Sequence, residues 1–264
     1  MIALVTGASS GIGEATARRL AREPGARLVL VARREARLRA LAGELGGATV
    51  IAADLLSDDA PVRIARALER EHGRLDLLVN NAGAAWRGQF AEAGWDNVRR
   101  HMELNFDATV RLTEALLPLL RRSAPSAIVN VASTAGRVAR GNSGAYSASK
   151  FALVGWSDAL HLEERPHGVH VGMVLPGFVA TEGFPQAELR ARALTRWMVS
   201  KPQRVAEAIL DAGPGGAPER YVPRPYWLAA ALRTLAPRLV RRALSGSGAV
   251  AMTPATHADE PDRG

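Results

Sequence analysis

The sequence alternates short apolar runs with longer amphipathic segments over most of its length. Apolar runs of β-rich residues, such as IALV and RLVLVA, are each followed by a stretch with helical periodicity. The predicted helices cover 11–22, 34–45, 59–72, 92–121 and 145–164. Strands separated by helices of this length are typical of βαβ units with parallel strands and right-handed crossovers. The sequence therefore predicts a doubly wound α/β fold in a single domain.

The pattern also sets the expected boundaries of the domain. We predict that residues 1–225 form the domain and that 226–244 form an additional basic amphipathic helix. The last residues, 245–264, are rich in Ser, Gly, Pro and charged side chains, which predicts a poorly ordered tail.

Composition argues against several classes of site and partner. The chain has no cysteine, so disulfides, thiolate nucleophiles and Cys-based metal sites are excluded. Its net charge is +8, but the arginines are scattered and only 5% of residues are aromatic, so nucleic-acid binding is not favoured. His161, His167 and His170 lack a convincing ligand geometry, and we predict no metal site. No apolar run reaches 18 residues, which favours a cytoplasmic protein.

A glycine-rich loop, TGASSGIG, follows the first apolar run and leads into the first predicted helix. Small residues let a backbone approach a pyrophosphate, and a helix amino terminus offers free N–H groups. The spacing is GxxxGxG rather than GxGxxG, and a glycine turn without a ligand is the alternative. The residues assigned to cofactor binding here are Gly7, Ser9, Ser10, Gly11, Ile12 and Gly13.

Arg33 and Arg34 follow the second apolar run, about twenty residues beyond the glycine loop. An acidic residue at this place would accept from a ribose 2′-hydroxyl, whereas guanidinium groups suit a 2′-phosphate. We therefore predict NADP(H) as the cofactor, preferred over NAD(H). The alternative is that both arginines belong to the solvated face of the next helix.

Two further strand ends complete the predicted cofactor site. Asp54, with Leu55 after it, could accept from an adenine amino group or could cap a turn. The sequence NNAG closes the fourth run, and we assign Asn81, Ala82 and Gly83 to the cofactor, while Asn80 is expected to tie loops together.

The stretch SGAYSASK holds Tyr146 and Lys150, one of three tyrosines and one of two lysines in a chain with 34 basic residues. Positions four apart share a helix face. A chain that otherwise uses arginine indicates that the chemistry needs a compact, titratable ammonium at position 150. The alternative is a solvated helix lysine.

With these motifs in this order, and with Ser133 thirteen positions before Tyr146, residues 2–225 resemble the short-chain dehydrogenase/reductase family. The resemblance implies NAD(P)-dependent interconversion of a carbonyl and an alcohol on a Rossmann-like sheet. It implies that Lys150 also contacts the nicotinamide ribose and that Asn105 holds a proton-relay water through its backbone. In PGFVAT it implies cofactor contacts by Pro176, Gly177, Val179 and Thr181.

The chemistry of these residue types agrees with that implication. Carbonyl reduction needs a proton donor within hydrogen-bond reach of the oxygen, and Tyr146 is the candidate. An ammonium about 4 Å away would lower the phenol pKa toward neutrality. Ser133 would orient the carbonyl, although a lone serine after a strand is more often a helix cap.

The substrate segment is expected after the sixth apolar run, at about 178–201. Its large apolar residues are Phe178, Phe184, Trp197 and Met198, which favour a lipophilic ketone, aldehyde or secondary alcohol. Equally, they could pack a lid on the core.

In 226–244, leucines at 228, 232, 235 and 239 form one helical face, and Arg233, Arg238, Arg241 and Arg242 add four charges. This helix could rest on an anionic membrane, but packing on the body or on a second subunit is favoured. The family resemblance implies a homodimer or homotetramer built through the helices at 97–121 and 146–164.

The resulting hypothesis is an NADP(H)-dependent oxidoreductase with Tyr146 as the general acid/base. Two alternatives are an NAD-linked alcohol or steroid dehydrogenase and a non-catalytic, membrane-associated nucleotide-binding protein.

Overall fold

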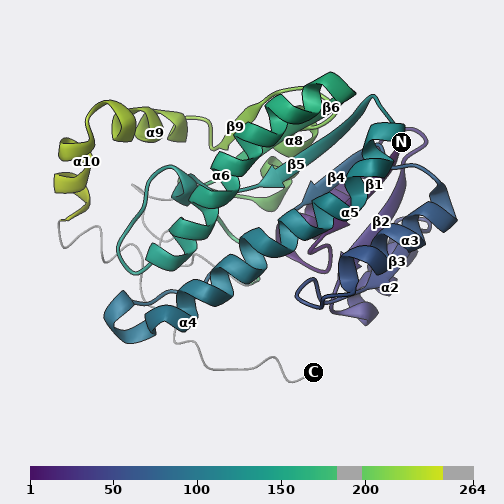
Figure 1. The fold of residues 1–264 in the computed structure, drawn as a ribbon, viewed down its shortest axis with the longest axis horizontal. Helices are drawn as coiled ribbons and strands as arrows, with labels where there is room; N and C mark the ends of the chain where they lie inside the picture. The colour runs from purple at the N-terminus through teal and green to yellow at the C-terminus, as the bar shows by residue number, and fades with distance from the viewer. Residues whose placement is uncertain (183–197, 246–264) are drawn as a thin grey trace.

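A parallel sheet forms the centre of the molecule in this computed structural model, which describes residues 1–182 and 198–245 (Figure 1). Its strands are β1 (Ile2–Thr6), β2 (Arg27–Ala32), β3 (Thr49–Ala52), β4 (Leu77–Asn80), β5 (Ser126–Val131), β6 (Val169–Pro176) and β9 (Glu219–Val222). The seven strands lie in the order β3-β2-β1-β4-β5-β6-β9, and every neighbouring pair is parallel. The order reverses between β1 and β4, which confirms the predicted doubly wound fold and places the switch point there.

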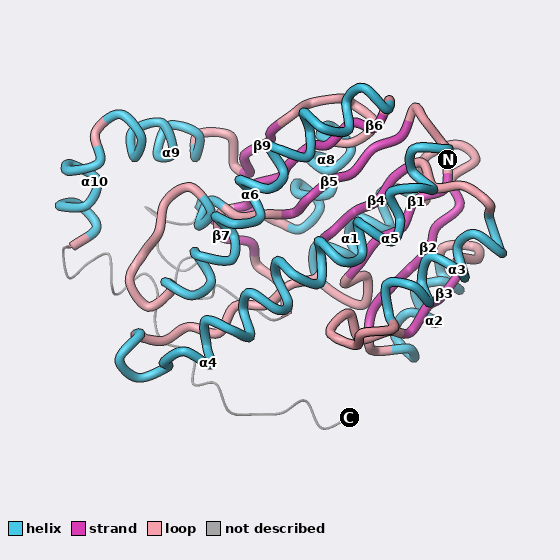
Figure 2. The backbone as a smooth tube through the Cα atoms, in the orientation of Figure 1, coloured by secondary structure: helices cyan, strands magenta, loops and turns pink. Residues whose placement is uncertain are grey.

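Helices cover both faces of the sheet (Figure 2). They are α1 (Gly11–Leu20), α2 (Glu35–Glu44), α3 (Ala60–His72), α4 (Phe90–Met102), α5 (Ala108–Arg122), α6 (Gly144–Glu164) and α8 (Pro202–Ala212). Apolar side chains of α1, α2 and α8 share one core with the sheet, and those of α3, α5 and α6 share the other. Strand β1 shows why its sequence is a continuous apolar run: Ala3 and Val5 enter the first core, while Leu4 enters the second.

The expected single helix over 92–121 is wrong, because a π-helical turn, η1 (Glu103–Asp107), lies between α4 and α5. Such turns widen the backbone spiral by one residue and occur often at functional sites. Here η1 carries Asn105, which is fully buried. Two short 3₁₀ turns, η2 (Thr134–Gly136) and η3 (Arg165–His167), flank α6 in the sequence.

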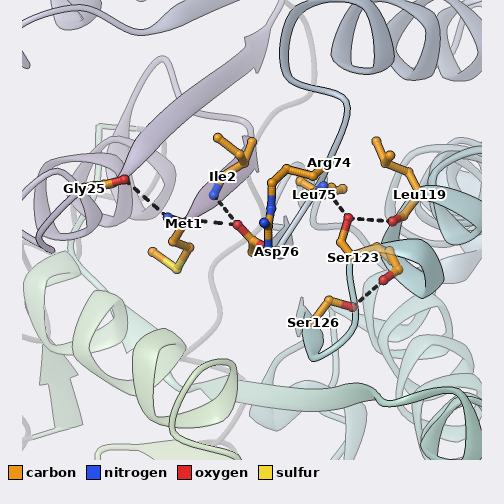
Figure 3. A network of polar contacts seen from close by, with 10 residues as sticks. Met1, Ile2, Gly25, Arg74, Leu75, Asp76, Leu119, Ser123 and Ser126 are labelled. Carbon is orange, nitrogen blue, oxygen red and sulfur yellow. Dashed lines mark hydrogen bonds and ion pairs between the residues drawn. The ribbon is translucent and has the colours of Figure 1, made fainter.

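A polar network fixes the amino-terminal edge of the sheet, at the ends of the strands away from the glycine loop (Figure 3). The Asp76 carboxylate accepts from the backbone N–H of Ile2 at 2.6 Å, which ties the start of β1 to the chain entering β4. The Ser123 hydroxyl accepts from the N–H of Leu75 at 3.0 Å. These contacts fix the register in which the strands enter the sheet, and so the positions of their carboxyl ends.

A two-stranded parallel ladder lies at the carboxyl end of β6. It pairs β7 (Phe178–Val179) with β8 (Val199–Ser200). The ladder holds the chain on either side of 183–197, so Phe178 and Met198 are described, whereas Phe184 and Trp197 lie outside the described residues.

The basic segment forms two helices rather than one: α9 (Tyr226–Leu235) and α10 (Pro237–Leu244). Ala236, with φ −134° and ψ 62°, breaks the helix because Pro237 cannot continue it. We call α9 and α10 together the C-terminal arm. The arm leaves five large apolar side chains exposed: Trp227, Leu228, Leu232, Leu235 and Leu239. Apart from Ser245, the predicted tail at 245–264 lies outside the described residues. Among the described helices, none is long and apolar enough to cross a membrane.

Candidate active site

A cavity of about 610 Å³ lies at the carboxyl ends of the strands, where open α/β sheets bind ligands. It runs from the glycine loop and the end of β2 to the loops that follow β4, β5 and β6. Of the predicted cofactor and catalytic residues, Gly13 and Asn105 lie behind the lining. The others all contribute to it: Gly7, Ser9, Ser10, Gly11, Ile12, Arg33, Arg34, Asp54, Leu55, Asn81, Ala82, Gly83, Ser133, Tyr146, Lys150, Pro176, Gly177, Val179 and Thr181.

The glycine loop has the geometry of a phosphate cradle. Gly7 and Gly11 adopt φ of 64° and 60°, a left-handed conformation that favours glycine. A Cβ on Gly13 would lie 2.2 Å from the carbonyl oxygen of Gly7, so α1 packs on the loop only with glycine there. Ser10 precedes α1 without capping it through its side chain, so the first-turn N–H groups are left for a ligand. These residues fit a dinucleotide pyrophosphate.

Arg33 and Arg34 occupy different environments, although the same role was predicted for both from the sequence. The Arg34 guanidinium donates to the hydroxyls of Ser9 and Ser10, at 3.2 and 2.7 Å, and so braces the glycine loop. Arg33 is exposed at the rim of the cavity and has no ion-pair partner among the described residues. The guanidinium of Arg33 is therefore exposed at the cavity rim, whereas that of Arg34 is engaged by the glycine loop.

Asp54 caps a turn, which is one of the two roles that the sequence allowed for it. Its Oδ1 accepts from the backbone N–H of Leu56 at 3.0 Å. The residue is half-buried and also lines the cavity, so its second oxygen is left for a ligand.

The NNAG loop is tied to the end of β1 by one hydroxyl. The Oγ1 of Thr6 accepts from the N–H of Asn81 and of Ala82, at 2.9 and 3.0 Å. Asn80 ties β4 to its neighbours, since its Nδ2 donates to Thr113 and to Asn130. This agrees with the structural role expected for Asn80.

Asn105 links η1 to the same loop through its side chain. Its Oδ1 accepts from the N–H of Ala84 at 2.9 Å, and its Nδ2 donates to the carbonyl of Ala84 and to the hydroxyl of Ser149. The side chain is thus used for positioning, which leaves the backbone for the relay role that the resemblance implies.

Ser133, Tyr146 and Lys150 meet at the floor of the cavity. Ser133 follows β5, and its hydroxyl caps η2 by accepting from the N–H of Ala135 at 3.1 Å and donates to the carbonyl of Pro176 at 3.4 Å. It also lies close enough to Tyr146 to lower the pKa of that phenol. The position of Ser133 is therefore compatible with both of its predicted roles, the cap of a helical turn and the orientation of a substrate carbonyl. One turn of α6 sets Lys150 below Tyr146, with Nζ 5.9 Å from the ring centroid. The Lys150 ammonium donates to the carbonyl of Val131 at 2.9 Å.

The expected lowering of the Tyr146 pKa is wrong for the chain by itself. Burial raises the pKa of this phenol, and the hydrogen bond with Ser133 and the charges of Arg87 and Arg140 only partly oppose it. Lys150 is buried, and burial lowers its own pKa to about 8. The phenol therefore stays protonated at neutral pH, which is the form that a proton donor requires.

Sequence reasoning missed Arg87 and Arg140, which line the cavity beside Tyr146. Arg87 lies in the loop between β4 and α4, and Arg140 in the loop between η2 and α6. The signal available in the sequence was that both arginines lie in segments that follow strand ends. The first loop is anchored by the buried His101, whose Nε2 accepts from the N–H of Trp86 at 3.0 Å.

The histidines at 161 and 170 satisfy backbone carbonyls, of Val171 and Ala212, at 2.9 Å each. Within residues 1–182 and 198–245, no three His, Asp or Glu side chains are grouped to hold a metal ion.

Comparison with known proteins gives matches over most of the chain. The family model of the short chain dehydrogenases matches residues 1–190. Oxidoreductase UcpA of Salmonella typhimurium is 40% identical over 197 residues, 72% of each chain. The rhamnolipids biosynthesis 3-oxoacyl-(acyl-carrier-protein) reductase of Pseudomonas aeruginosa is 37% identical over 231 residues, 83% of this chain and 84% of the relative. Dehydrogenase/reductase SDR family member 7B of Danio rerio is 33% identical, and the match spans 61% of that protein.

Two solved structures extend the likeness to the fold. The Pseudomonas aeruginosa RhlG/NADP active-site complex superposes with a TM-score of 0.74 at 32% identity, over 83% of this chain and 93% of that one. A short-chain dehydrogenase from Streptomyces avermitilis superposes with a TM-score of 0.76 at 30% identity, over 94% and 97%. The chain therefore belongs to the short-chain dehydrogenase/reductase family, the NAD(P)-dependent dehydrogenases and reductases.

Proposed function

We propose that this chain is an NADP(H)-dependent oxidoreductase that interconverts a lipophilic ketone or aldehyde and its alcohol. The observation that carries the proposal is one continuous cavity, lined at one end by the glycine loop and Arg33 and at the other by Ser133, Tyr146 and Lys150. A site for a nucleotide phosphate and a site for proton transfer thus open into the same space.

The proposed mechanism assigns a separate task to each side chain. The bound nicotinamide would supply the hydride. Ser133 would hold the substrate oxygen by a hydrogen bond, and Tyr146, protonated at neutral pH, would give that oxygen its proton. Lys150 would keep a positive charge beside the phenol as it becomes a phenolate. Because NADPH is the proposed cofactor and a hydride donor, reduction is the direction that we propose.

We predict that Arg33→Met weakens NADPH and spares NADH. A guanidinium hydrogen-bonded to a phosphate contributes roughly 1.5–3 kcal/mol, so the KM for NADPH should rise roughly ten- to a hundredfold. The KM for NADH should change less than about twofold, because NADH has no 2′-phosphate. Steady-state kinetics with both cofactors measure the two values.

A matched control is Arg39→Met, which removes an exposed arginine of α2 that pairs with Glu35 away from the cavity. It should leave both KM values unchanged. Equal weakening of NADPH and NADH by Arg33→Met would contradict the NADP(H) assignment.

The cavity supports an apolar substrate portion near the reacting centre. Trp86, Leu104 and Phe178 line the end that holds Tyr146. Aromatic and aliphatic walls with a few polar groups are usual for small-molecule sites.

We further propose that the C-terminal arm makes peripheral contact with an anionic membrane surface. Residues 226–244 contain four arginines and no acidic residue, and α9 has no buried residue. The expected packing of its apolar face on the body is therefore not seen in the described residues.

Sedimentation with anionic and with neutral vesicles tests the membrane contact. The full chain should sediment with anionic vesicles only, and a chain ending at residue 225 should sediment with neither. Equal sedimentation of both chains would overturn this proposal.

We also propose a homo-oligomer, as a homodimer or homotetramer, in which α6 takes part. The supporting observation is that Phe151 and Leu162 of α6 are 44% and 70% exposed. Light scattering should give a mass of two or four times 28.1 kDa, and the mass of a monomer would contradict the proposal.

A further inference from the structure

Two arginines stand at the substrate end of the cavity, and the proposed hydride and proton transfers use neither of them. Arg87 and Arg140 approach from different loops, after β4 and after β5, and both are half-buried. They are close enough to the phenol of Tyr146, and Arg140 to Arg87, for their charges to influence one another. The far end of the cavity already has its own cations, Arg33 and Arg34.

Arg140 has an unusual environment for an arginine of this chain. Its guanidinium carbon lies 4.6 Å from the centroid of the Phe178 ring. Its contacts among the described residues include no carboxylate. Arg137, only three positions earlier, pairs with Glu219 and Asp158 at 3.2 and 3.7 Å. A carboxylate partner was therefore within the reach of this loop, yet Arg140 lines the cavity and pairs with no carboxylate in the part of the chain that the structure describes.

Arg87 and Arg140 line the same cavity, and the charge of Arg87 acts on Arg140. Two positive groups in a partly desolvated space repel, and an anion bound by both would reduce that repulsion. Burial lowers the pKa of Arg140, and the charge of Arg87 lowers it further, while Tyr226 and Tyr146 oppose the change; no carboxylate of the described residues takes part. Guanidinium groups bind carboxylates in a planar, two-bonded geometry. Because Trp86 and Phe178 line the same end, the ligand also has an apolar part.

We propose that Arg87 and Arg140 bind a carboxylate of the substrate, so that the enzyme selects an amphiphilic keto acid over its neutral ester. This inference rests on the proposed function, because it takes Tyr146 to mark the position of the carbonyl. Arg87 and Arg140 are then specificity-determining residues.

The test measures binding without turnover. The enzyme is saturated with NADP⁺, with which a ketone cannot react, and is titrated calorimetrically with γ- and δ-keto acids of increasing chain length and with their methyl esters. At least one acid should bind roughly ten- to a hundredfold more tightly than its ester, as expected for a hydrogen-bonded ion pair. Arg140→Met should bring the ratio of ester Kd to acid Kd close to one, and Arg140→Lys should leave an intermediate ratio.

The matched control is Arg99→Met, an exposed arginine of α4 that pairs with Asp96 and Glu103 and lies outside the cavity lining. It should keep the wild-type ratio. Equal binding of acid and ester by the wild type, or no binding of either, would overturn the inference. So would an acid preference that survives in Arg140→Met.

Turnover with NADPH, measured in parallel on the same compounds, separates this inference from the proposed function. Reduction of acid and ester alike, with equal affinities, would overturn the inference and leave the proposed function standing. An acid preference that depends on Arg140, with no compound reduced, would support the anion site and overturn the proposed reaction.

Discussion

Tyr146→Phe should lower the rate of NADPH-dependent carbonyl reduction by roughly 10² to 10⁴, the range that general acid catalysis contributes. The substitution removes one oxygen atom and keeps the ring that lies edge-on to His101, with centroids 6.1 Å apart. The fold should therefore persist and NADPH should still bind. The rate is measured from NADPH absorbance with a ketone that the wild type reduces.

Tyr221→Phe is the matched control, because Tyr221 is another of the three tyrosines and lies on β9 outside the cavity lining. Its turnover should stay within about twofold of the wild type. If Tyr146→Phe kept more than about a tenth of the wild-type rate, Tyr146 would not be the proton donor.

Lys150→Met should reduce turnover by roughly ten- to a hundredfold while it stabilises the fold at neutral pH. Burial lowers the pKa of Lys150 from 10.5 to about 8, so below about pH 8 the folded state carries a charged group at a cost on the order of 3 kcal/mol. Between about pH 8 and 10.5 the unfolded chain binds more protons at this position than the folded chain. The wild type should therefore gain free energy of unfolding relative to Lys150→Met as the pH rises through this window.

Urea unfolding of both proteins at about pH 7 and about pH 9.5 measures that change. Lys201→Met provides the control, since Lys201 is the other lysine of the chain and is exposed. Its removal should change the free energy of unfolding little at either pH, because the exposed side chain keeps its contact with water in the folded state. A Lys150→Met difference that is also independent of pH would show that the lysine is not charged and buried in the fold.

The sequence predicted the parts of the site that depend on local chemistry. The strand and helix pattern located the carboxyl ends of β1, β2, β4, β5 and β6, and the structure brings the residues predicted there into one cavity. Gly7, Gly11 and Gly13 could be recognised because Gly7 and Gly11 need a left-handed backbone and Gly13 leaves no room for a Cβ. The four-residue spacing of Tyr146 and Lys150 fixed their common helix face.

What the sequence could not predict depends on contacts between distant segments. Arg33 and Arg34 are adjacent in sequence, but Arg34 turns to the hydroxyls of the glycine loop and Arg33 does not. Arg87 and Arg140 are far apart in sequence, and only the packing of two loops brings them to Tyr146. The direction of the Tyr146 pKa was wrong because burial, which the sequence does not give, outweighs the nearby charges.

The π-helical turn at Glu103–Asp107 shows the same limit in the backbone. Nothing in ELNFD differs from helical periodicity, so the sequence predicted one continuous helix. In the fold, the Asn105 side chain hydrogen-bonds to the backbone N–H and the carbonyl of Ala84. The π-helical turn places Asn105 where it makes these two hydrogen bonds. Tertiary contacts, and not local preference, accompany this irregularity.

The central claim is that one cavity combines an NADP(H) site with carbonyl reduction. The most direct measurement compares the oxidation of NADPH and of NADH by the wild type with lipophilic ketones and keto acids, together with analysis of the alcohol formed. We predict that one alcohol forms for each NADPH consumed and that kcat/KM is roughly tenfold or more higher with NADPH than with NADH. Tight NADPH binding without alcohol formation from any compound, or a preference for NADH, would contradict the claim.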